Sequence, residues 1–264
     1  MTAGEDKALL QLYAHGEELL ARARGGEITA TAYLTPREAR RLAAHLSYAR
    51  EELFLFGGYE GAERCRMFFL PDYVREADAS LRALLLEDTL RERVCPLQME
   101  GSGFAELSHR DYMGALLNLG VERDTVGDIC VLSPHRAVLF CDRLMSTFFT
   151  ENLTRVARDA VRVTPAALPP DFDGGRRFQA VSDTVASPRA DAVVAALCNL
   201  SRERARALFV EGRVELDYEP ADKPDREIVA GTVVTVRGYG KFIVRSLSDK
   251  TKKGRYRLLS DRYA

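Results

Sequence analysis

The 264-residue sequence lacks any run of eighteen apolar residues, the length a membrane-spanning helix requires. Its N-terminal segment mixes acidic and basic residues, whereas a secretory signal would need an apolar stretch there. We therefore expect a cytoplasmic protein with no membrane partner. The hydrophobic fraction of 46% is nevertheless ample for packed cores.

The sequence is also poor in groups that bind metals or carry out catalysis. Its five cysteines are scattered and include no CxxC pair, which argues against a disulfide framework and a zinc site. Four histidines show no metal-ligand spacing, and no Ser/His/Asp or Cys/His set is apparent. We expect no metal, no cofactor and no catalytic residue.

Charge is distributed unevenly along the chain. From residue 187 onward there are 16 Lys or Arg against 11 Asp or Glu, a net charge of plus five, which leaves minus six for residues 1–186 because the whole chain is at minus one. The segment RGYGKFIVRSLSDKTKKGRYR holds eight basic residues and one acid, Asp249. Such clustering indicates a polyanion binder, although a charged strand pair that only aids solubility is the simpler alternative.

The first 78 residues predict an N-terminal domain. Residues 5–24 have near-helical apolar spacing, and a second helix begins at Thr35, which forms a capping box with Glu38. Residues 54–71 then read as strand, glycine turn and strand. Residues 79–98 are compatible with either a short helix or a buried strand.

The middle region, residues 79-165, predicts an alpha-beta plait. We expect a strand at 103–107, a helix capped by Ser108 through Asp111, a hairpin turning at 133–135, a second helix, and a last strand ending at Pro165. This order of elements is shared by RNA-recognition motifs, ferredoxin-like enzymes and many binding modules. It therefore says little about function on its own.

Prolines and glycines mark residues 166-186 as a linker and connecting strand, and residues 187-264 form a last module. Within it, a helix break at Asn199 precedes a helix capped by Ser201. On that helix Arg202 and Arg206 lie four residues apart along one flank of an apolar face, Arg204 lies on the opposite flank, and Arg213 follows the helix end. We expect the Arg202 and Arg206 pair to bind phosphate oxygens; alternatively, these arginines pair internally with acids such as Glu203 or Asp217.

The last module resembles the S-four RNA-binding domain, named after a small-subunit ribosomal protein. The resemblance rests on the following residues: Arg189, Asp191, Val194, Leu197, Ser201, Arg202, Ala205, Arg206, Gly212, Val214, Lys223, Pro224 and Gly231. The chain departs from the pattern at Ala190, Glu215 and Asp217. Glu215 and Asp217 stand where the family often has a basic residue and an asparagine. We therefore expect weaker RNA contacts on the strand side of the module.

The segments LTPREARRL, FGGYEGAERCRMFFLP and LSHRDYMGALLNLGVERDTVGDI, with the basic ending, resemble the bacterial YlmH family over nearly the whole chain. The resemblance implies an α+β chain made of an N-terminal α/β domain, an RNA-recognition-motif-like alpha-beta plait and a C-terminal S-four (αL-type) domain. It further implies a monomeric, non-enzymatic RNA binder whose partners are large-subunit ribosomal RNA, tRNA or peptidyl-tRNA, and other factors of ribosome quality control. A link to cell division has also been attached to the family.

The expected RNA-binding residues all lie in the last module: Arg189, Arg202, Arg206, Arg213, Lys223, Arg237, Lys241, Lys250, Lys252, Lys253 and Arg255. The three lysines are expected at the exposed tip of a C-terminal hairpin that turns at Gly254, beside the arginine flank. An RNA-modifying enzyme, either a pseudouridine synthase or a methyltransferase that docks through its S-four domain, is the alternative function. It lacks support from a catalytic motif in this sequence.

Overall fold

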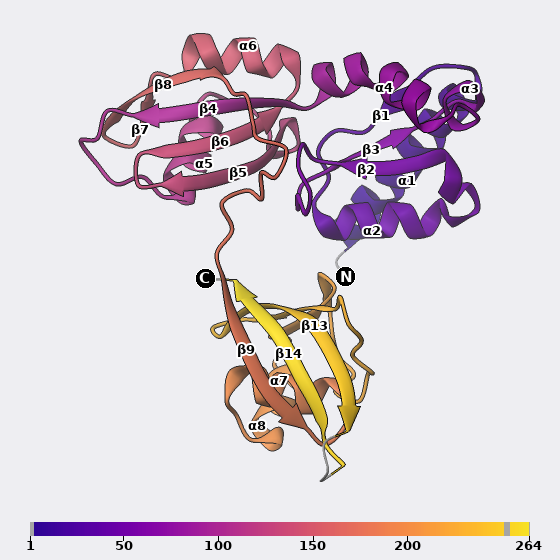
Figure 1. Cartoon of the computed structure of the whole chain (residues 1–264), viewed down its shortest axis with the longest axis vertical. Coiled ribbons are helices and arrows are strands. Elements are labelled where there is room, and N and C mark those ends of the chain that lie inside the picture. The colour runs from indigo at the N-terminus through magenta and orange to yellow at the C-terminus, as the bar shows by residue number, and fades with distance from the viewer. Residues whose placement is uncertain (1–2, 251–253, 264) are drawn as a thin grey trace. The chain divides into compact units, whose positions relative to one another are not determined.

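The computed structural model describes residues 3–250 and 254–263, and the chain divides into two compact units, Met1–Gly175 and Arg176–Ala264. Helices and strands are mixed in both units (Figure 1), so the predicted α+β class is confirmed. Each unit contains its own buried apolar cluster. No helix in the described ranges is long and apolar enough to cross a membrane.

The first unit opens with helices packed on a small antiparallel sheet of strand order β1-β3-β2. Leu20 and Leu42, one from each of the first two helices, are buried together with Met67 of the central strand. The elements of this part are α1 (Ala3–Arg24), β1 (Thr29–Ala30), α2 (Pro36–His45), the 3-10 helix η1 (Ser47–Glu52), β2 (Leu53–Phe56), β3 (Arg66–Phe69), α3 (Asp72–Arg75) and α4 (Ala79–Arg93).

Local sequence signals explain where two of these helices begin. The predicted capping box of α2 is confirmed, because Thr35 Oγ1 accepts a hydrogen bond from the Glu38 amide at 3.3 Å and the Glu38 carboxylate accepts one from the Thr35 amide at 2.8 Å. Of residues 79–98, which the sequence left open between helix and strand, residues 79–93 form α4 and residues 95–98 belong to a strand; the α4 cap Asp78 accepts from the Ser80 amide at 2.9 Å.

The predicted plait follows, with sheet order β5-β6-β4-β8-β7 and antiparallel neighbours throughout. Its four main strands and two helices have the expected order of strand, helix, strand, strand, helix, strand. Helices α5 and α6 cover one face, where Leu97, Leu139 and Phe149 are fully buried. The elements are β4 (Cys95–Gly101), α5 (His109–Asn118), the 3-10 helix η2 (Arg123–Thr125), β5 (Val126–Ser133), β6 (Arg136–Cys141), α6 (Arg143–Asn152), β7 (Arg155–Val156) and β8 (Asp159–Pro165).

The strand predicted at residues 103–107 is wrong, because the first strand of the plait is β4. Alternation in β4 buries Leu97 and Met99, but Pro96 conceals this short pattern in the sequence. The chain leaves the sheet after Gly101: Phe104 is 78% exposed, and the buried Asp159 carboxylate accepts a hydrogen bond from the Gly103 amide at 3.3 Å. The predicted cap of α5 is confirmed, since Asp111 accepts from the Ser108 amide at 2.9 Å.

Residues of the same unit cover the second face of the plait at β5 and β6. Phe140 of β6 lies 5.3 Å, centroid to centroid, from the ring of Tyr59, which in turn lies 5.3 Å from that of Phe172. Phe172 and Leu168 come from the segment after β8, and both pack against this cluster. RNA-recognition motifs stack bases on the equivalent sheet face. In this chain that face is filled at β5 and β6 by aromatic side chains of the protein itself.

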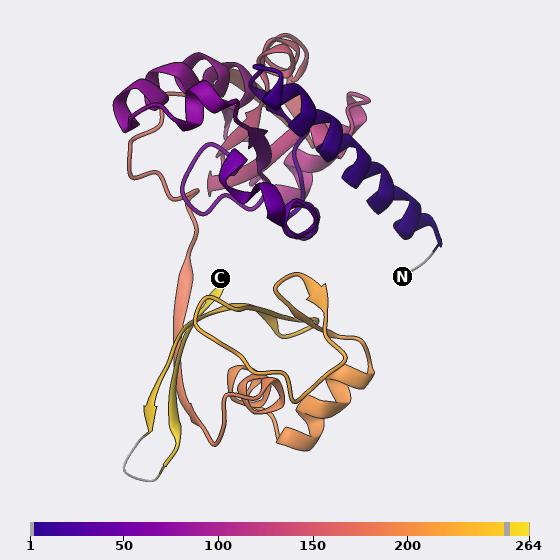
Figure 2. The same ribbon diagram turned by 90° about the vertical axis from the view of Figure 1, so that its right-hand side faces the viewer.

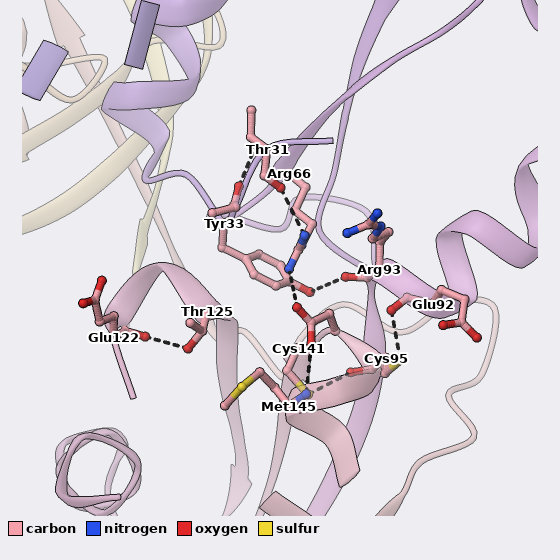
Figure 3. A network of polar contacts seen from close by, with 12 residues as sticks. Thr31, Tyr33, Arg66, Glu92, Arg93, Cys95, Glu122, Thr125, Cys141 and Met145 are labelled. Atoms are coloured by element: carbon pink, nitrogen blue, oxygen red, sulfur yellow. Dashed lines mark hydrogen bonds and ion pairs between the residues drawn. The ribbon is translucent and has the colours of Figure 1, made fainter. Parts of the chain in front are cut away.

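A buried arginine joins the small sheet to the plait. Arg66 of β3 is 5% exposed; it donates to the Thr31 carbonyl at 3.1 Å and to the Asp142 carboxylate at 3.1 Å. Its guanidinium carbon lies 4.7 Å from the centroid of the Tyr33 ring (Figure 3). Asp142 also caps α6 by accepting from the Met145 amide at 2.9 Å. The start of α6 is thus fixed to the first sheet.

The second unit is a six-stranded sheet of order β11-β10-β12-β13-β14-β9 with two helices, α7 and α8, on one face (Figures 1 and 2). The predicted break and turn are confirmed, because Asn199 and Gly212 have φ values of 53° and 64°. Ser201 caps α8 by accepting from the Arg204 amide at 3.1 Å. The elements are β9 (Phe178–Val185), α7 (Ala190–Cys198), α8 (Arg202–Val210), β10 (Val214–Leu216), β11 (Glu219–Pro220), β12 (Val233–Val236), β13 (Gly240–Lys250) and β14 (Tyr256–Tyr263).

The structure describes the region between the plait and the last module in more detail than the sequence does. Residues up to Gly175 belong to the first unit, whereas β9 pairs with β14 from Phe178 to Val185 and is an edge strand of the second sheet. The predicted bounds 1-78, 79-165 and 187-264 remain a prediction about domains. In the structure the first two of these segments lie within one compact unit.

Candidate nucleic-acid interface

Three arginines of the second unit surround one buried carboxylate. Asp191, in the first turn of α7, is fully buried and accepts hydrogen bonds to both oxygens from Arg202 Nη2 at 2.9 Å. Arg206 Nε donates to it at 2.8 Å and Arg189 Nε at 3.4 Å. We call Arg189, Arg202 and Arg206 the arginine cluster.

The order of the two helices produces this arrangement. Helix α7 is apolar and buried along most of its length, so its first-turn acid is carried into the interior. Only a short break at Asn199 separates the helices, and α8 therefore folds back against α7 with its first two turns at Asp191. Residues four apart lie on one flank of a helix, so Arg202 and Arg206 reach the same carboxylate.

The cluster keeps hydrogen-bond donors for a ligand. Arg206 uses only its Nε on Asp191, and its terminal nitrogens have no hydrogen bond or ion pair with any residue that the structure describes. The side chains of Arg189, Arg202 and Arg206 are 39%, 45% and 55% exposed. Three guanidinium groups against one carboxylate leave a local charge of plus two. Guanidinium groups in a fixed orientation bind phosphate oxygens in a bidentate manner.

Asp191 remains ionised at neutral pH. Burial acts to raise the pKa of its carboxyl group, but the hydrogen bonds from the three guanidinium groups outweigh burial, and the net shift of the pKa is downward. The charge that orients the arginine cluster is therefore present throughout the neutral range.

The loop that contains Lys223 is fastened to the same helix start. The Asp191 amide donates to the Pro224 carbonyl at 2.8 Å, and the Ala190 amide donates to the Arg226 carbonyl at 2.8 Å. Lys223 is exposed and directly precedes Pro224. The structure thus brings four of the predicted residues to one side of the unit: Arg189, Arg202, Arg206 and Lys223.

The predicted Arg213 and Arg237 lie elsewhere, on the opposite flank of α8. Glu211 accepts hydrogen bonds from Arg204 at 2.6 Å and from Arg213 at 3.3 Å. Arg213 also donates to the Arg237 carbonyl at 2.6 Å. Arg213 therefore ties the end of α8 to the β12–β13 turn, and Arg237 is exposed on that turn.

The remaining predicted residues lie on β13 and β14. Lys241 Nζ is 4.8 Å from the ring centroid of Tyr218 and 4.6 Å from that of Tyr263. Arg255 Nε donates to Thr184 Oγ1 at 2.9 Å. Lys250 ends β13, and Gly254 has a φ of 73° before β14 begins. Lys252 and Lys253 lie outside the described residues, so the predicted lysine tip beside the arginine flank stays a prediction.

The internal partner of the arginine cluster is not one of the expected acids. The alternative of internal pairing named Glu203 and Asp217 as examples, but the partner is Asp191, while Asp217 pairs with Arg226 at 3.4 Å. A single acid in an otherwise apolar helix was the available signal. An acid in the first turn of a helix is usually explained by its favourable interaction with the helix dipole. For that reason the sequence alone does not indicate that Asp191 contacts the arginines.

Metal binding has no basis in the described part of the chain. There, no group of three or more His, Cys, Asp or Glu side chains could hold a metal ion.

Basic residues clustered on one face of a domain are the electrostatic feature expected of nucleic-acid-binding proteins. A family model described as "Putative RNA-binding domain in YlmH" matches residues 98–169, which lie in the plait. The resemblance to the YlmH family of RNA-binding proteins found in the sequence is confirmed by this match and by a curated relative.

Two known proteins are similar to the chain to different degrees. The chain is 29% identical over 234 residues to the ribosome-associated protein quality control protein P2 of Bacillus subtilis (strain 168), covering 88% of this chain and 86% of that relative. The solved structure of the cell division protein ylmH from Streptococcus pneumoniae aligns with a TM-score of 0.47 and 17% identity, over 63% of this chain and 94% of that one. The family model and the relative's name point to RNA binding and quality control and to no enzyme family.

Proposed function

We propose that this chain is a non-enzymatic RNA-binding protein of the large ribosomal subunit, where it contacts ribosomal RNA and tRNA during quality control of stalled peptidyl-tRNA. The observation that carries the proposal is the arginine cluster, in which a buried carboxylate orients three guanidinium groups whose free donors face solvent. The relative named as a ribosome-associated quality control protein supports the ribosomal setting.

Two flanks of the same helix provide a matched test of the proposal. Arg206 and Arg204 lie on opposite sides of α8; the first pairs with buried Asp191 and the second with exposed Glu211. Arg206→Gln should weaken co-sedimentation with purified large subunits by about tenfold and lower the salt dependence by about one phosphate contact. Arg204→Gln should change binding less than twofold, which counts as no effect.

Folding must be checked in both variants, because Arg206 also pairs with a buried charge. Circular dichroism at the temperature of the binding assay serves this purpose. Equal losses in Arg206→Gln and Arg204→Gln, with both variants folded, would contradict the assignment of the interface to the arginine cluster.

A role without catalysis has its own test. Large-subunit RNA incubated with the protein and S-adenosylmethionine should gain no methyl groups, and pseudouridine maps should be the same with and without the gene. A modification that depends on the protein would favour the alternative, an RNA-modifying enzyme.

A further inference from the structure

The face of the second sheet opposite α7 and α8 carries a row of aromatic rings and cations. Phe242 of β13 is buried against the helices, so its neighbour Lys241 points to the other face. The register pairs Phe242 with Arg262 and Tyr263 with Phe178, which places Lys241, Tyr263 and Phe178 side by side on β13, β14 and β9. Figure 1 shows these strands in front of the helices.

The row contains both cation–ring and ring–ring contacts. Lys241 Nζ lies between the rings of Tyr218 and Tyr263, at 4.8 and 4.6 Å from their centroids. The Tyr263 ring meets the Phe178 ring edge to face at 5.1 Å, and the Arg245 guanidinium carbon lies 5.6 Å from the centroid of Phe178. Arg245 is also paired with Asp261 at 2.7 Å.

The row contributes nothing to the apolar core. Tyr218, Tyr263 and Phe178 are absent from the cluster that α7 and α8 bury, and Phe178 is 40% exposed. Tyr218 and Tyr263 are half-buried, and partly exposed aromatic side chains that gather on one face are a frequent sign of a binding surface.

The backbone at Tyr218 adds an independent observation. Asp217 and Tyr218 close the two-residue turn between β10 and β11, with φ values of 54° and 67°. Glycine or asparagine is usual in such a turn, and a bulky side chain is disfavoured there. Strain of this kind persists where the surrounding structure holds it, frequently at functional sites. Here it places the Tyr218 ring beside Lys241.

We infer that this face binds unpaired RNA, with bases stacked on the rings of Tyr218, Tyr263 and Phe178 and the phosphate backbone following Lys241. The inference rests on the proposed RNA-binding function and extends it, because the arginine cluster would take phosphates of folded RNA while this face takes bases. Aromatic rings between cations are the arrangement that holds single strands without sequence preference. The basic segment to which Lys241 belongs, with eight cations and one acid, favours a polyanion over a peptide.

The test uses the full chain and a short unstructured oligouridylate, with the isolated large subunit measured in parallel. Tyr263→Leu and Phe178→Leu keep apolar bulk but remove a ring, and Leu259→Ala is the matched control because Leu259 lies on the same face and is 48% exposed. Since the chain has ten tyrosines and no tryptophan, quenching of tyrosine emission reports stacking directly. Each ring variant should weaken oligouridylate binding by about fivefold or more and reduce the quenching, while the control stays within about twofold.

Tyr218→Gly separates binding from stability. Glycine adopts positive φ freely, so this variant should melt at or above the wild-type temperature and still bind oligouridylate more weakly. If the row has only a structural role, Tyr218→Gly should instead lower the melting temperature and leave oligouridylate binding unchanged.

The outcomes distinguish this inference from the proposed function. Equal oligouridylate affinity in wild type and Tyr263→Leu, or an equal loss in Leu259→Ala, overturns the inference. The inference is also overturned if the wild-type protein binds the subunit but not the oligonucleotide. In each of these cases, the proposed function still stands if subunit binding depends on Arg206. Ring variants that lose only subunit binding would indicate a protein occupant and would also overturn it. If the wild-type protein binds neither the oligouridylate nor the large subunit, both the inference and the proposed function are wrong.

Discussion

Replacing Asp191 with asparagine tests whether the buried carboxylate organises the arginine cluster. Asparagine keeps the shape but loses the charge, and its amide NH2 would face guanidinium donors. The carboxylate accepts hydrogen bonds from three arginines, and such bonds to charged groups contribute about 1.5–3 kcal/mol each when fully desolvated. The guanidinium groups are about half exposed and can return to water, so we expect a loss of about 2–3 kcal/mol for the site as a whole.

Calorimetry of the full chain measures this loss at pH 7. In a unit of this size, about 2–3 kcal/mol corresponds to a fall of roughly 10–20 °C in the melting transition. The two units need not melt together, and hydrogen exchange of the α7 amides identifies the transition that belongs to Arg176–Ala264. Asp225→Asn is the matched control, because Asp225 is exposed in the same unit and the charge change is identical.

The dependence on pH gives the prediction a sign. The pKa of Asp191 is lower in the folded protein than in the unfolded chain, so its stabilisation is complete above the unfolded value of about 3.9 and is lost as the pH falls through the lower folded value. Wild type and Asp191→Asn should therefore differ most at neutral pH and converge below about pH 4. A variant that melts with the wild type at pH 7, or a difference that persists in strong acid, would refute the reasoning.

Three further predictions concern other parts of the chain. The first unit expressed alone as residues 1–175 should fold but bind RNA weakly, because these residues carry a net charge of minus seven; tight subunit binding by this fragment would move the main interface to the plait. If about five to seven cations of the second unit each neutralise a phosphate, log affinity should fall against log salt with a slope of about minus 3.5 to minus 6, and alanine at Lys250, Lys252 and Lys253 should flatten it by about 2; a wild-type slope near zero would assign these charges to solubility. Gly58→Ala should destabilise the first unit by about 1–3 kcal/mol in urea unfolding, because Gly58 has a φ of 102° and an added Cβ would lie 2.3 Å from the Phe140 ring; an unchanged midpoint would contradict that account.

Features set by neighbouring residues could be predicted from the sequence. The capping box at Thr35, the left-handed stop at Asn199 and the turn at Gly212 each depend on a few consecutive residues. The flank of Arg202 and Arg206 also follows from helical periodicity alone. Such signals predict where elements begin and end, and which residues share a face.

Features that depend on long-range contacts could not be predicted from the sequence. The partner of Arg206 lies 15 residues away on another helix, and nothing local shows that Asp191 is buried. Lys241 meets Tyr263 only through the register of two strands. The plait's first strand was missed because Pro96 and its brevity hide the alternation, and the filling of the sheet face by Phe172 needs the path of a segment that resembles a linker.

The bonds between Asp191 and the arginine cluster also bear on the entropy of RNA binding. A free arginine side chain loses about 2 kcal/mol of rotamer freedom when it is immobilised. In this chain part of that freedom is already lost in the folded protein, because Arg202 and Arg206 are held by a carboxylate fixed in the core. An incoming phosphate would therefore order less, and the affinity of the proposed surface would depend on the integrity of α7, a helix that itself lies buried behind the arginine cluster.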